Sequence, residues 1–497
     1  MVSLVNDQIK IPNIIPNWIA GLESFSDSNK TLEKMCPHKG KIIYSLTDSD
    51  ANDVKKAISI AKEAQIRWMN LTPVERGKKL YEFCEKLEAN KLNLANIVAR
   101  ETGKSPKDAL GETQGAIDLG RFFAGEGQRL YGRTTTSGQL DKYSMTVRQP
   151  CGLAGLIVAA NTPIANIAWK VFPALICGNA IILKVPEDTP AIGWLFGKYF
   201  HEIAGLPMGL LNVIQGQGDR AGAPIVKSND VDVISFTGST QVGKWIGEVA
   251  GGQLKKVSLE LGGKNPLIVC DDANLKNAVS WSCLSAFSNA GQRCAAGSRI
   301  IVFESIYEKF KKAFIQKTSE LKLGNTDNDD LGPVINLRQL NSMIKSVESA
   351  EFNGAKVLIG GSRYMDDNLE EGYYMSPTII ENISTEDEIH EKELFGPIAQ
   401  LYKVSSYEEA MHLANSSSYG LTACIHTTNF DRASDFSYKI KSGVAVVNAG
   451  TYGSEPHMPF GGLGLSGNGS REPGTEALDV YSELKDIYLN VNRSNLD

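Results

Sequence analysis

One cysteine, Cys294, stands in the segment SNAGQRCAAGSR, residues 288–299, among small residues and directly after Arg293. A thiolate is a strong nucleophile, and a neighbouring positive charge lowers the pKa of a thiol. The competing interpretation is a small apolar side chain in a tight space, which is the common role of a buried cysteine. The segment therefore offers a candidate nucleophile and leaves both roles open.

Two polar side chains follow apolar stretches elsewhere in the chain. Glu260 lies in LELGGKNP, and Asn161 lies in AANTPIAN. A carboxyl group buried at such a point is either hydrogen-bonded or raised in pKa, and a raised pKa suits a general base near neutral pH. The Asn161 amide can donate to a developing oxyanion, or it can cap the helix that begins at Pro163. Catalytic and structural roles remain open for both residues.

A third group of residues has the pattern of a nucleotide site. In FTGSTQVGKWIG, Gly238 and Ser239 follow a predicted strand and open a predicted helix, where backbone N–H groups can face a phosphate. In ILKVPED, Lys184 and Glu187 lie at a strand end, where a carboxylate can accept hydrogen bonds from ribose hydroxyls. An ordinary strand–turn–helix and a solvated charge pair are the alternatives.

The first part of the chain is predicted to be mainly helical. Apolar residues recur at helical spacing over 51–70, 75–103 and 106–130, and the second of these helices is expected to stop at Gly103. Over 131–150, threonines followed by YSMTVRQP indicate strands.

The remainder alternates between strands and helices. From 151 to 262, short apolar runs without polar alternation (GLAGLIVAA, AIILKVP, LLNVIQG, VDVISFTG, KKVSLELGG) are separated by helical stretches. Such runs indicate a parallel sheet covered on both faces, which would place the chemical residues at its strand ends. A second block of this kind runs from 265 to 459, and the tail 476–490 is strand-like.

Length and composition indicate a globular protein of several domains. The chain has 497 residues, of which 42% are hydrophobic and 22% charged, with a net charge of −6. These values argue against nucleic acid as a partner, and no apolar run is long enough for a membrane span. The eight cysteines show no metal-ligand spacing, and no signal peptide precedes them. We therefore expect reduced thiols, no metal, no membrane partner and a cytoplasmic location.

In order along the chain, AANTP, ILKVPED, FTGSTQVG, LELGGK, NAGQRCAAGSR, ELFGP and MPFGGLGLSGNG resemble the motifs of the aldehyde dehydrogenase superfamily. The resemblance covers nearly the whole chain. It implies an α/β fold with a Rossmann-like cofactor-binding domain formed by 1–130 and 151–262. A catalytic α/β domain would follow at 263–460. A small β extension for oligomerisation would combine strands from 131–150 and 475–495.

The same resemblance implies a two-step covalent oxidation of an aldehyde to a carboxylic acid with NAD(P)⁺. Cys294 would attack the aldehyde carbon to form a thiohemiacetal, whose oxyanion Asn161 and the Cys294 backbone N–H would hold. Hydride loss would give a thioester, and Glu260 would activate the water that hydrolyses it. Lys170 and Glu472 would assist proton transfer, although SGNGSREPG around Glu472 is one residue longer than the usual pattern.

Further positions match cofactor and substrate contacts. Glu187 favours NAD over NADP, because a carboxylate repels a 2′-phosphate, although NADP stays open. The implied cofactor contacts are Ile157, Val158, Ala160, Lys184, Glu187, Gly218, Phe236, Gly238, Ser239, Val242, Leu261, Glu393 and Phe395. The implied substrate pocket consists of Thr162, Asn166, Trp169, Ser288, Arg293, Ser454 and Phe460.

The substrate positions depart from the common family pattern toward small and polar residues. Ala160 and Thr162 flank Asn161 where Trp and Phe are common, Ser288 stands where many members carry an aromatic residue, and Asn166 replaces an apolar one. A polar aldehyde or semialdehyde is therefore expected. Trp169 stands where succinate-semialdehyde enzymes carry arginine, which disfavours that substrate.

Three alternatives to this function stay open. The first is a CoA-acylating dehydrogenase, which the presence of Glu260 disfavours because such relatives often lack this base. The second is a binding protein of the same fold that has lost its activity, and the third is a thioesterase-like hydrolase with no redox step. A homodimer or homotetramer is the expected assembly.

Overall fold

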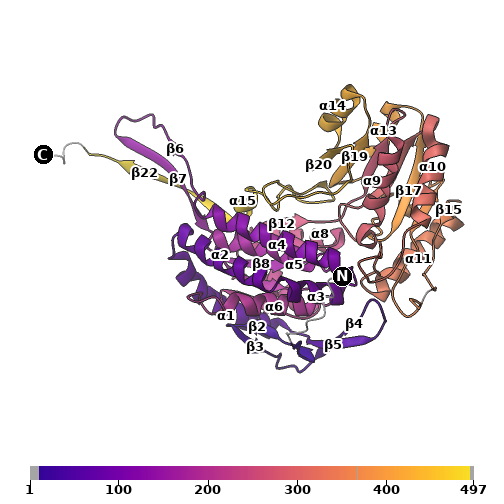
Figure 1. Cartoon of the computed structure of the whole chain (residues 1–497). Helices are drawn as coiled ribbons and strands as arrows, with labels where there is room; N and C mark the ends of the chain where they lie inside the picture. Colours follow the sequence, from indigo (N-terminus) through magenta and orange to yellow (C-terminus); the bar gives the residue numbers. More distant parts are fainter. Residues whose placement is uncertain (1–9, 367, 493–497) are drawn as a thin grey trace.

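The computed structural model describes residues 10–366 and 368–492, and two separate seven-stranded sheets dominate it (Figure 1). The first sheet is parallel except at one edge, where two short antiparallel strands join it. Its order is β12 (Lys256–Glu260), β11 (Val233–Thr237), β8 (Leu153–Ile157), β9 (Ala180–Lys184), β10 (Leu211–Ile214), β2 (Asn17–Ile19) and β3 (Leu22–Ser24). The predicted parallel sheet is confirmed.

Helices enclose this first sheet and share one apolar core with it. They are α1 (Ala51–Met69), α2 (Pro73–Ala89), α3 (Lys91–Thr102), α4 (Pro106–Glu126), α5 (Pro163–Ile176), α6 (Pro190–His201), α7 (Ala223–Lys227) and α8 (Thr240–Gly252), with a π-helical turn at Gly218–Gly222. The helix predicted over 75–103 is in fact two helices. They are separated at Asn90, whose amide donates to the Lys86 carbonyl at 2.8 Å and thereby ends α2.

The second sheet is also parallel except for one edge strand. Its order is β15 (Lys356–Ile359), β16 (Thr378–Glu381), β17 (Ile398–Val404), β14 (Gly297–Phe303), β13 (Asn265–Val269), β19 (Thr422–His426) and β20 (Val444–Val447). Its helices are α9 (Leu275–Phe287), α10 (Glu304–Ser319), α11 (Leu337–Phe352), α12 (Glu388–Glu391), α13 (Tyr407–Ala414) and α14 (Phe430–Lys439), with a 3₁₀ turn at Ser288–Gly291.

Side chains of the central strand β13 show why this sheet is covered on both faces. Leu267 and Val269 belong to the apolar cluster that includes residues of α9 and α10, whereas Ile268 belongs to the cluster that includes residues of α13 and α14. Successive residues of a strand point to opposite faces. A strand buried on both sides needs apolar residues at every position, which is the unbroken run seen in NPLIV.

A small three-stranded sheet projects as an arm (Figure 1). β7 (Lys142–Pro150) pairs antiparallel with β22 (Ser482–Asn490), and the short β6 (Thr134–Thr135) lies beside β7. The tail was predicted as strand from residue 475, but α15 (Ala477–Tyr481) precedes β22, because Ala477, Leu478 and Tyr481 bury one face at helical spacing. Residues 1–9 and 493–495, which the sequence assigns to the cofactor domain and the arm, lie outside the described residues.

Small sheets complete the architecture. One combines β1 (Ile14–Ile15), β5 (Ile42–Thr47) and β4 (Thr31–Met35), and another combines β18 (Tyr419–Gly420) and β21 (Leu463–Gly464). The link that matters for function is residues 261–264, which join β12 of the first sheet directly to β13 of the second. Glu260 is the last residue of β12, so it lies where the two sheets are connected.

Candidate active site

A turn with unusual backbone conformation precedes Cys294. Asn289, Ala290 and Gly291 have φ angles of 55°, 53° and 67°, all in the left-handed region. Two consecutive non-glycine residues there are uncommon and cost free energy, and such strain is concentrated at functional sites. The Asn289 amide donates to the carbonyls of Gln292 at 3.2 Å and Asn161 at 3.4 Å, which ties this turn to the end of the first sheet.

The environment of Cys294 disfavours the thiolate when the site holds no positive charge. Burial raises the pKa of the thiol to about 12, and the carboxyl groups of Glu393 and Glu260 add to this effect, whereas backbone amides of Cys294 and Ala295 oppose it. The Cys294 carbonyl accepts a hydrogen bond from Asn265 Nδ2 at 2.7 Å. This contact fixes the loop that carries the Cys294 sulfur.

The Asn161 amide has a defined orientation. Its Nδ2 donates to the Gln292 carbonyl at 3.0 Å, and its Oδ1 accepts from Asn166 Nδ2 at 3.2 Å. The Asn161 carbonyl accepts from Lys104 Nζ at 2.9 Å. Because an amide nitrogen has two hydrogens, one N–H of Asn161 is left to donate beside the loop that carries Cys294. This is the donor that an oxyanion needs.

Glu260 is a buried carboxyl group to which no described residue donates a hydrogen bond. Its side chain is 4% exposed, and both oxygens lack a partner. Burial and then the charge of Glu472 raise its pKa well above the usual value, while Lys170 and Arg471 oppose the shift. A buried polar group without partners is costly, so a structural role does not explain this residue.

Lys170 and Glu472 form a buried ion pair near Glu260. The Lys170 ammonium lies 2.7 Å from a Glu472 oxygen, and both side chains are almost fully buried. Ser235, from β11, links them, because its hydroxyl accepts from Lys170 at 2.7 Å and donates to Glu472 at 2.8 Å. The extra residue in SGNGSREPG does not remove Glu472 from this place.

A cavity of about 510 Å³ opens at the carboxyl ends of β8, β9 and β11. Ligands bind at this edge of parallel α/β sheets. Nine of the thirteen cofactor positions named from the sequence line it: Ile157, Val158, Lys184, Glu187, Gly218, Phe236, Gly238, Ser239 and Val242. The Lys184 ammonium lies 3.1 Å from the Glu187 carboxylate, and this contact lowers the pKa of Glu187 against the effect of burial.

The other four cofactor positions do not line this cavity. Ala160 follows Ala159, which does, and Leu261 packs against Gly243 at the start of α8. Glu393 and Phe395 border a separate small cavity together with Gly263. The Gly263 N–H donates to Glu393 at 2.9 Å, and burial raises the pKa of Glu393 to about 7.

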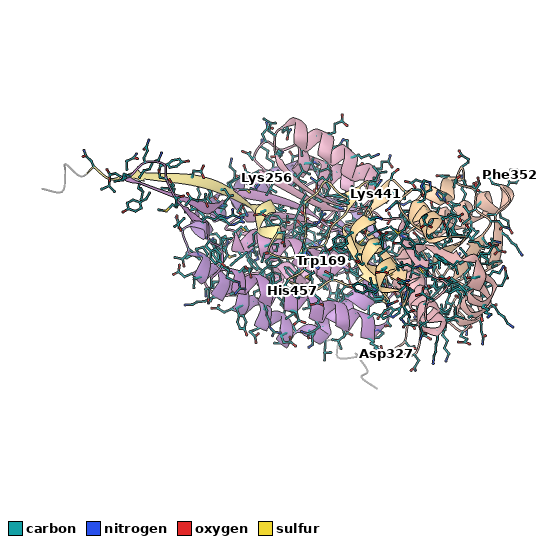
Figure 2. The ribbon with its side chains drawn as sticks, turned by 90° about the horizontal axis from the view of Figure 1, so that it is seen from above. Trp169, Lys256, Asp327, Phe352, Lys441 and His457 are labelled. Carbon is teal, nitrogen blue, oxygen red and sulfur yellow. The ribbon has the colours of Figure 1, made fainter. Side chains whose placement is uncertain are left out.

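Two substrate positions form an aromatic patch next to Cys294. The rings of Trp169 and Phe460 meet edge to face at 5.4 Å, and both contact a cluster that also contains Cys294 and Tyr452. Figure 2 shows Trp169 near the middle of the molecule, where the two sheet units meet. The Arg293 guanidinium lies over the Tyr452 ring at 4.8 Å.

The other substrate positions differ in their surroundings. Asn166 is buried and its amide is used inside the protein, where it donates to Asn161 and Thr162. Ser288 has a buried hydroxyl without a partner among the described residues, and Ser454 is exposed on the loop after β20. Asn166 therefore orients Asn161 instead of facing an open pocket.

Several residues at these sites were not found from the sequence. Arg338 and Trp245 line the 510 Å³ cavity, and Tyr481 donates to Glu472 at 2.7 Å. Lys264 anchors the loop before Glu393 by donating to the carbonyls of Ile389 and Lys392. For Lys264 and Trp245 the LELGGK and FTGSTQVGKWIG motifs were available signals; Arg338 and Tyr481 come from elements that only the tertiary fold brings to these sites.

The chemistry of the large cavity fits a dinucleotide. At one end Lys184 and Glu187 provide a charged pair for ribose hydroxyls, and Val226, Trp245 and Ile246 provide apolar surface. The start of α8 also lines the cavity, and backbone N–H groups there attract phosphate. In residues 10–366 and 368–492, no cluster of three or more His, Cys, Asp or Glu side chains suits a metal, and no helix is long and apolar enough to cross a membrane.

Comparison with known proteins agrees with this geometry. The profile of the aldehyde dehydrogenase family matches residues 25–487. The chain is 38% identical to an alpha-ketoglutaric semialdehyde dehydrogenase of Bacillus subtilis, covering 90% of this chain and 92% of that protein. It is 35% identical to a D-glyceraldehyde dehydrogenase (NADP(+)) of Picrophilus torridus, covering 96% and 97%.

A solved structure shows the same fold along nearly the whole chain. A crystal structure of betaine aldehyde dehydrogenase from Staphylococcus aureus in complex with NAD⁺ superposes with a TM-score of 0.94 at 32% identity, covering 96% of this chain and 95% of that one. The chain thus shares its fold with an aldehyde dehydrogenase whose solved structure contains NAD⁺. The chain belongs to the aldehyde dehydrogenase family and is an NAD(P)-dependent aldehyde dehydrogenase.

Proposed function

We propose that this enzyme oxidises a polar aldehyde or a semialdehyde to the carboxylic acid, with Cys294 as nucleophile, Asn161 as oxyanion donor and Glu260 as general base. The observation that carries this assignment is the Glu260 carboxyl group, buried and without a partner among the described residues beside the Cys294 loop. Its raised pKa suits a group that takes up and releases protons near neutral pH.

The chain's own residues account for both covalent half-reactions. Cys294 loses its proton and its sulfur bonds to the aldehyde carbon, while the Asn161 N–H and the Cys294 backbone N–H hold the oxyanion. The bound dinucleotide supplies a hydride acceptor. When the carbon has become a thioester, Glu260 takes a proton from water, the hydroxide adds to the carbon, and the C–S bond breaks to release the acid.

The dinucleotide we propose as preferred is NAD. Glu187 lines the large cavity close to Lys184, with Asp188 and Asp219 nearby in the lining. Three carboxylates outweigh Lys184 and Arg338 and disfavour a 2′-phosphate. We also propose that Glu393 and Phe395, in the loop after α12, contact the nicotinamide end of the dinucleotide.

For the substrate, we propose an aldehyde whose far end is neutral and hydroxylated or carries a carboxylate. The buried Nε of Arg293 has no hydrogen-bond partner among the described residues. A free guanidinium stacked on Tyr452 attracts an anion and repels a quaternary ammonium group. The Trp169–Phe460 patch adds apolar surface for the carbon chain.

The assembly we propose is a homodimer or homotetramer formed through the arm. Large apolar side chains are exposed along β7 and β22, among them Tyr143 at 65%, Leu484 at 62% and Tyr488 at 56%. Exposed apolar side chains on a projecting sheet mark an interaction surface, and a second subunit that covers them would stabilise the arm. The cytoplasm is the location we propose, because the eight cysteines are all free.

The function is tested by following NADH formation from NAD with an aldehyde panel and without CoA. We expect turnover of hydroxylated and carboxylate-bearing aldehydes, little turnover of quaternary ammonium aldehydes, and none in Cys294→Ala. Glu260→Gln should release one NADH per site and then stop, because the thioester forms but is not hydrolysed. Turnover only after CoA addition would show an acylating enzyme instead.

Two matched variants test the role of Arg293 in substrate recognition. Arg293→Met removes the charge and keeps an apolar stem, and Arg293→Lys keeps the charge. If a carboxylate is recognised there, KM for a carboxylate-bearing semialdehyde should rise about tenfold in Arg293→Met and less in Arg293→Lys, with KM for a neutral aldehyde unchanged. Equal KM changes for charged and neutral aldehydes would refute anion recognition.

A further inference from the structure

The Glu472 carboxylate accepts four hydrogen bonds from side chains that lie on four different elements. Its Oε1 accepts from Ser235 Oγ at 2.8 Å, Ser258 Oγ at 3.2 Å and Tyr481 Oη at 2.7 Å. Its Oε2 accepts from Lys170 Nζ at 2.7 Å. All five side chains are at most 1% exposed. Four donors converge on one carboxylate and hold Glu472 in a single orientation.

We propose that Tyr481, together with Ser235 and Ser258, is a positioning residue for thioester hydrolysis: the three hydroxyls hold Glu472 against Lys170, and this oriented pair controls how Glu260 acts as a base. The inference rests on the proposed role of Glu260. It assigns a task to Tyr481, which lies 221 positions along the chain from Glu260 and belongs to no motif named from the sequence.

The groups that influence the pKa of Glu260, or that Glu260 influences, come from three segments. Lys170 comes from α5, Arg471 and Glu472 come from the loop before α15, and the Cys294 thiol comes from the loop after α9. After burial, Glu472 is the largest cause of the raised Glu260 pKa, and Lys170 opposes it. If Glu472 turns away from Glu260, Lys170 acts alone, and Glu260 then ionises at lower pH as a weaker base.

Contacts that do not involve the hydroxyl fix the position of Tyr481, so the hydroxyl can be removed without displacing the residue. Its backbone carbonyl accepts from Asn179 Nδ2 at 2.8 Å, and its ring is buried in the core of the first sheet. Lys256 Nζ donates to the carbonyl of Ser482 at 2.6 Å, next to Tyr481, at the root of the arm, where Figure 2 labels Lys256. Tyr481→Phe keeps the ring and these backbone contacts and removes only the donor.

The experiment compares the pH dependence of thioester hydrolysis in wild type, Tyr481→Phe and Ser258→Ala. Rapid mixing with NAD and aldehyde separates the NADH burst from the later steady rate. We expect the rate of the NADH burst to be unchanged in both variants. In the pH profile of the steady rate, the plateau should fall about three- to tenfold, and the acidic limb should move to lower pH. Tyr307→Phe is the matched control, because this buried hydroxyl also donates to a carboxylate, Glu381 at 3.0 Å, far from the site.

The possible outcomes test the role of Tyr481 and the role of Glu260 separately. A lower steady rate without a moved acidic limb in both variants would mean a structural effect only and would overturn the inference, as would an equal loss in Tyr307→Phe. Glu260→Gln tests the underlying function separately. If that variant still hydrolyses the thioester, the proposed base is wrong; if it stalls after the burst while Tyr481→Phe keeps the wild-type limb, only the inference about Tyr481 fails.

Discussion

Asn166 is predicted to control acylation through the orientation of the Asn161 amide. Its Nδ2 donates to Asn161 Oδ1 at 3.2 Å and to the Ala159 carbonyl at 3.2 Å. Because Oδ1 is occupied in this way, Asn161 Nδ2 faces the Gln292 carbonyl and the Cys294 loop. Replacing Asn166 leaves Asn161 present but removes one of the two contacts that distinguish its oxygen from its nitrogen.

The size of the effect follows from that geometry. One neutral hydrogen bond contributes about 1 kcal/mol, and the contact of Nδ2 with Gln292 at 3.0 Å remains in Asn166→Ala. We therefore expect the acylation rate to fall about fivefold. Asn166→Asp places an acceptor beside Asn161 Oδ1 and favours the flipped amide, so its rate should fall toward that of Asn161→Ala, about 100- to 1,000-fold below wild type.

The assay is the single-turnover NADH burst at saturating NAD, with melting temperatures to establish that each variant is folded. The ordering wild type, Asn166→Ala, Asn166→Asp, Asn161→Ala is the expected result. An Asn166→Asp burst as fast as that of Asn166→Ala would show that the amide orientation is not set from this side. A wild-type burst in Asn161→Ala would remove the oxyanion role altogether.

Three further outcomes are expected. Glu187→Ser should raise kcat/KM with NADP relative to NAD by about tenfold, because a carboxylate near the ribose is lost; an unchanged ratio would contradict this. Iodoacetamide should alkylate Cys294 in the cofactor-free enzyme at least about a hundredfold more slowly than free cysteine, since its pKa is raised to about 12, and peptide mass spectrometry measures this. His426 is buried and its pKa is lowered to about 4, so the unfolded state binds more protons between pH 4 and 6.5. The free energy of unfolding should therefore fall by up to about 3 kcal/mol as pH drops through that range, and urea unfolding of His426→Gln should show a shallower dependence.

Much of the fold could be predicted because burial on both faces leaves a clear pattern. Runs such as GLAGLIVAA, AIILKVP and NPLIVC contain no polar alternation, and they form β8, β9 and β13 at the centres of the two sheets. Glu260 was recognisable for the same reason. A carboxylate that ends an apolar strand stands out from its neighbours, whatever its role.

The parts that were missed depend on distant contacts. The helix break at Asn90 is stabilised by Tyr199, whose hydroxyl donates to Asn90 Oδ1 at 3.1 Å from 109 positions away. The start of the tail is helical because Tyr481 reaches Glu472 and the first sheet. Asn166 was assigned to the substrate pocket by position, since only the fold shows that its amide is already used by Asn161.

The electrostatics of the site couple the Cys294 thiol to the carboxyl groups of Glu260 and Glu393. Cys294, Glu260 and Glu393 are all acids whose pKa values burial raises, and the negative charge of either carboxylate further raises that of the thiol. Ionising Glu260 or Glu393 therefore opposes ionising the Cys294 thiol. The buried Lys170–Glu472 ion pair acts on Glu260 in two opposite ways, because Glu472 raises the pKa of Glu260 and Lys170 lowers it. The orientation of this pair therefore sets the pKa of Glu260.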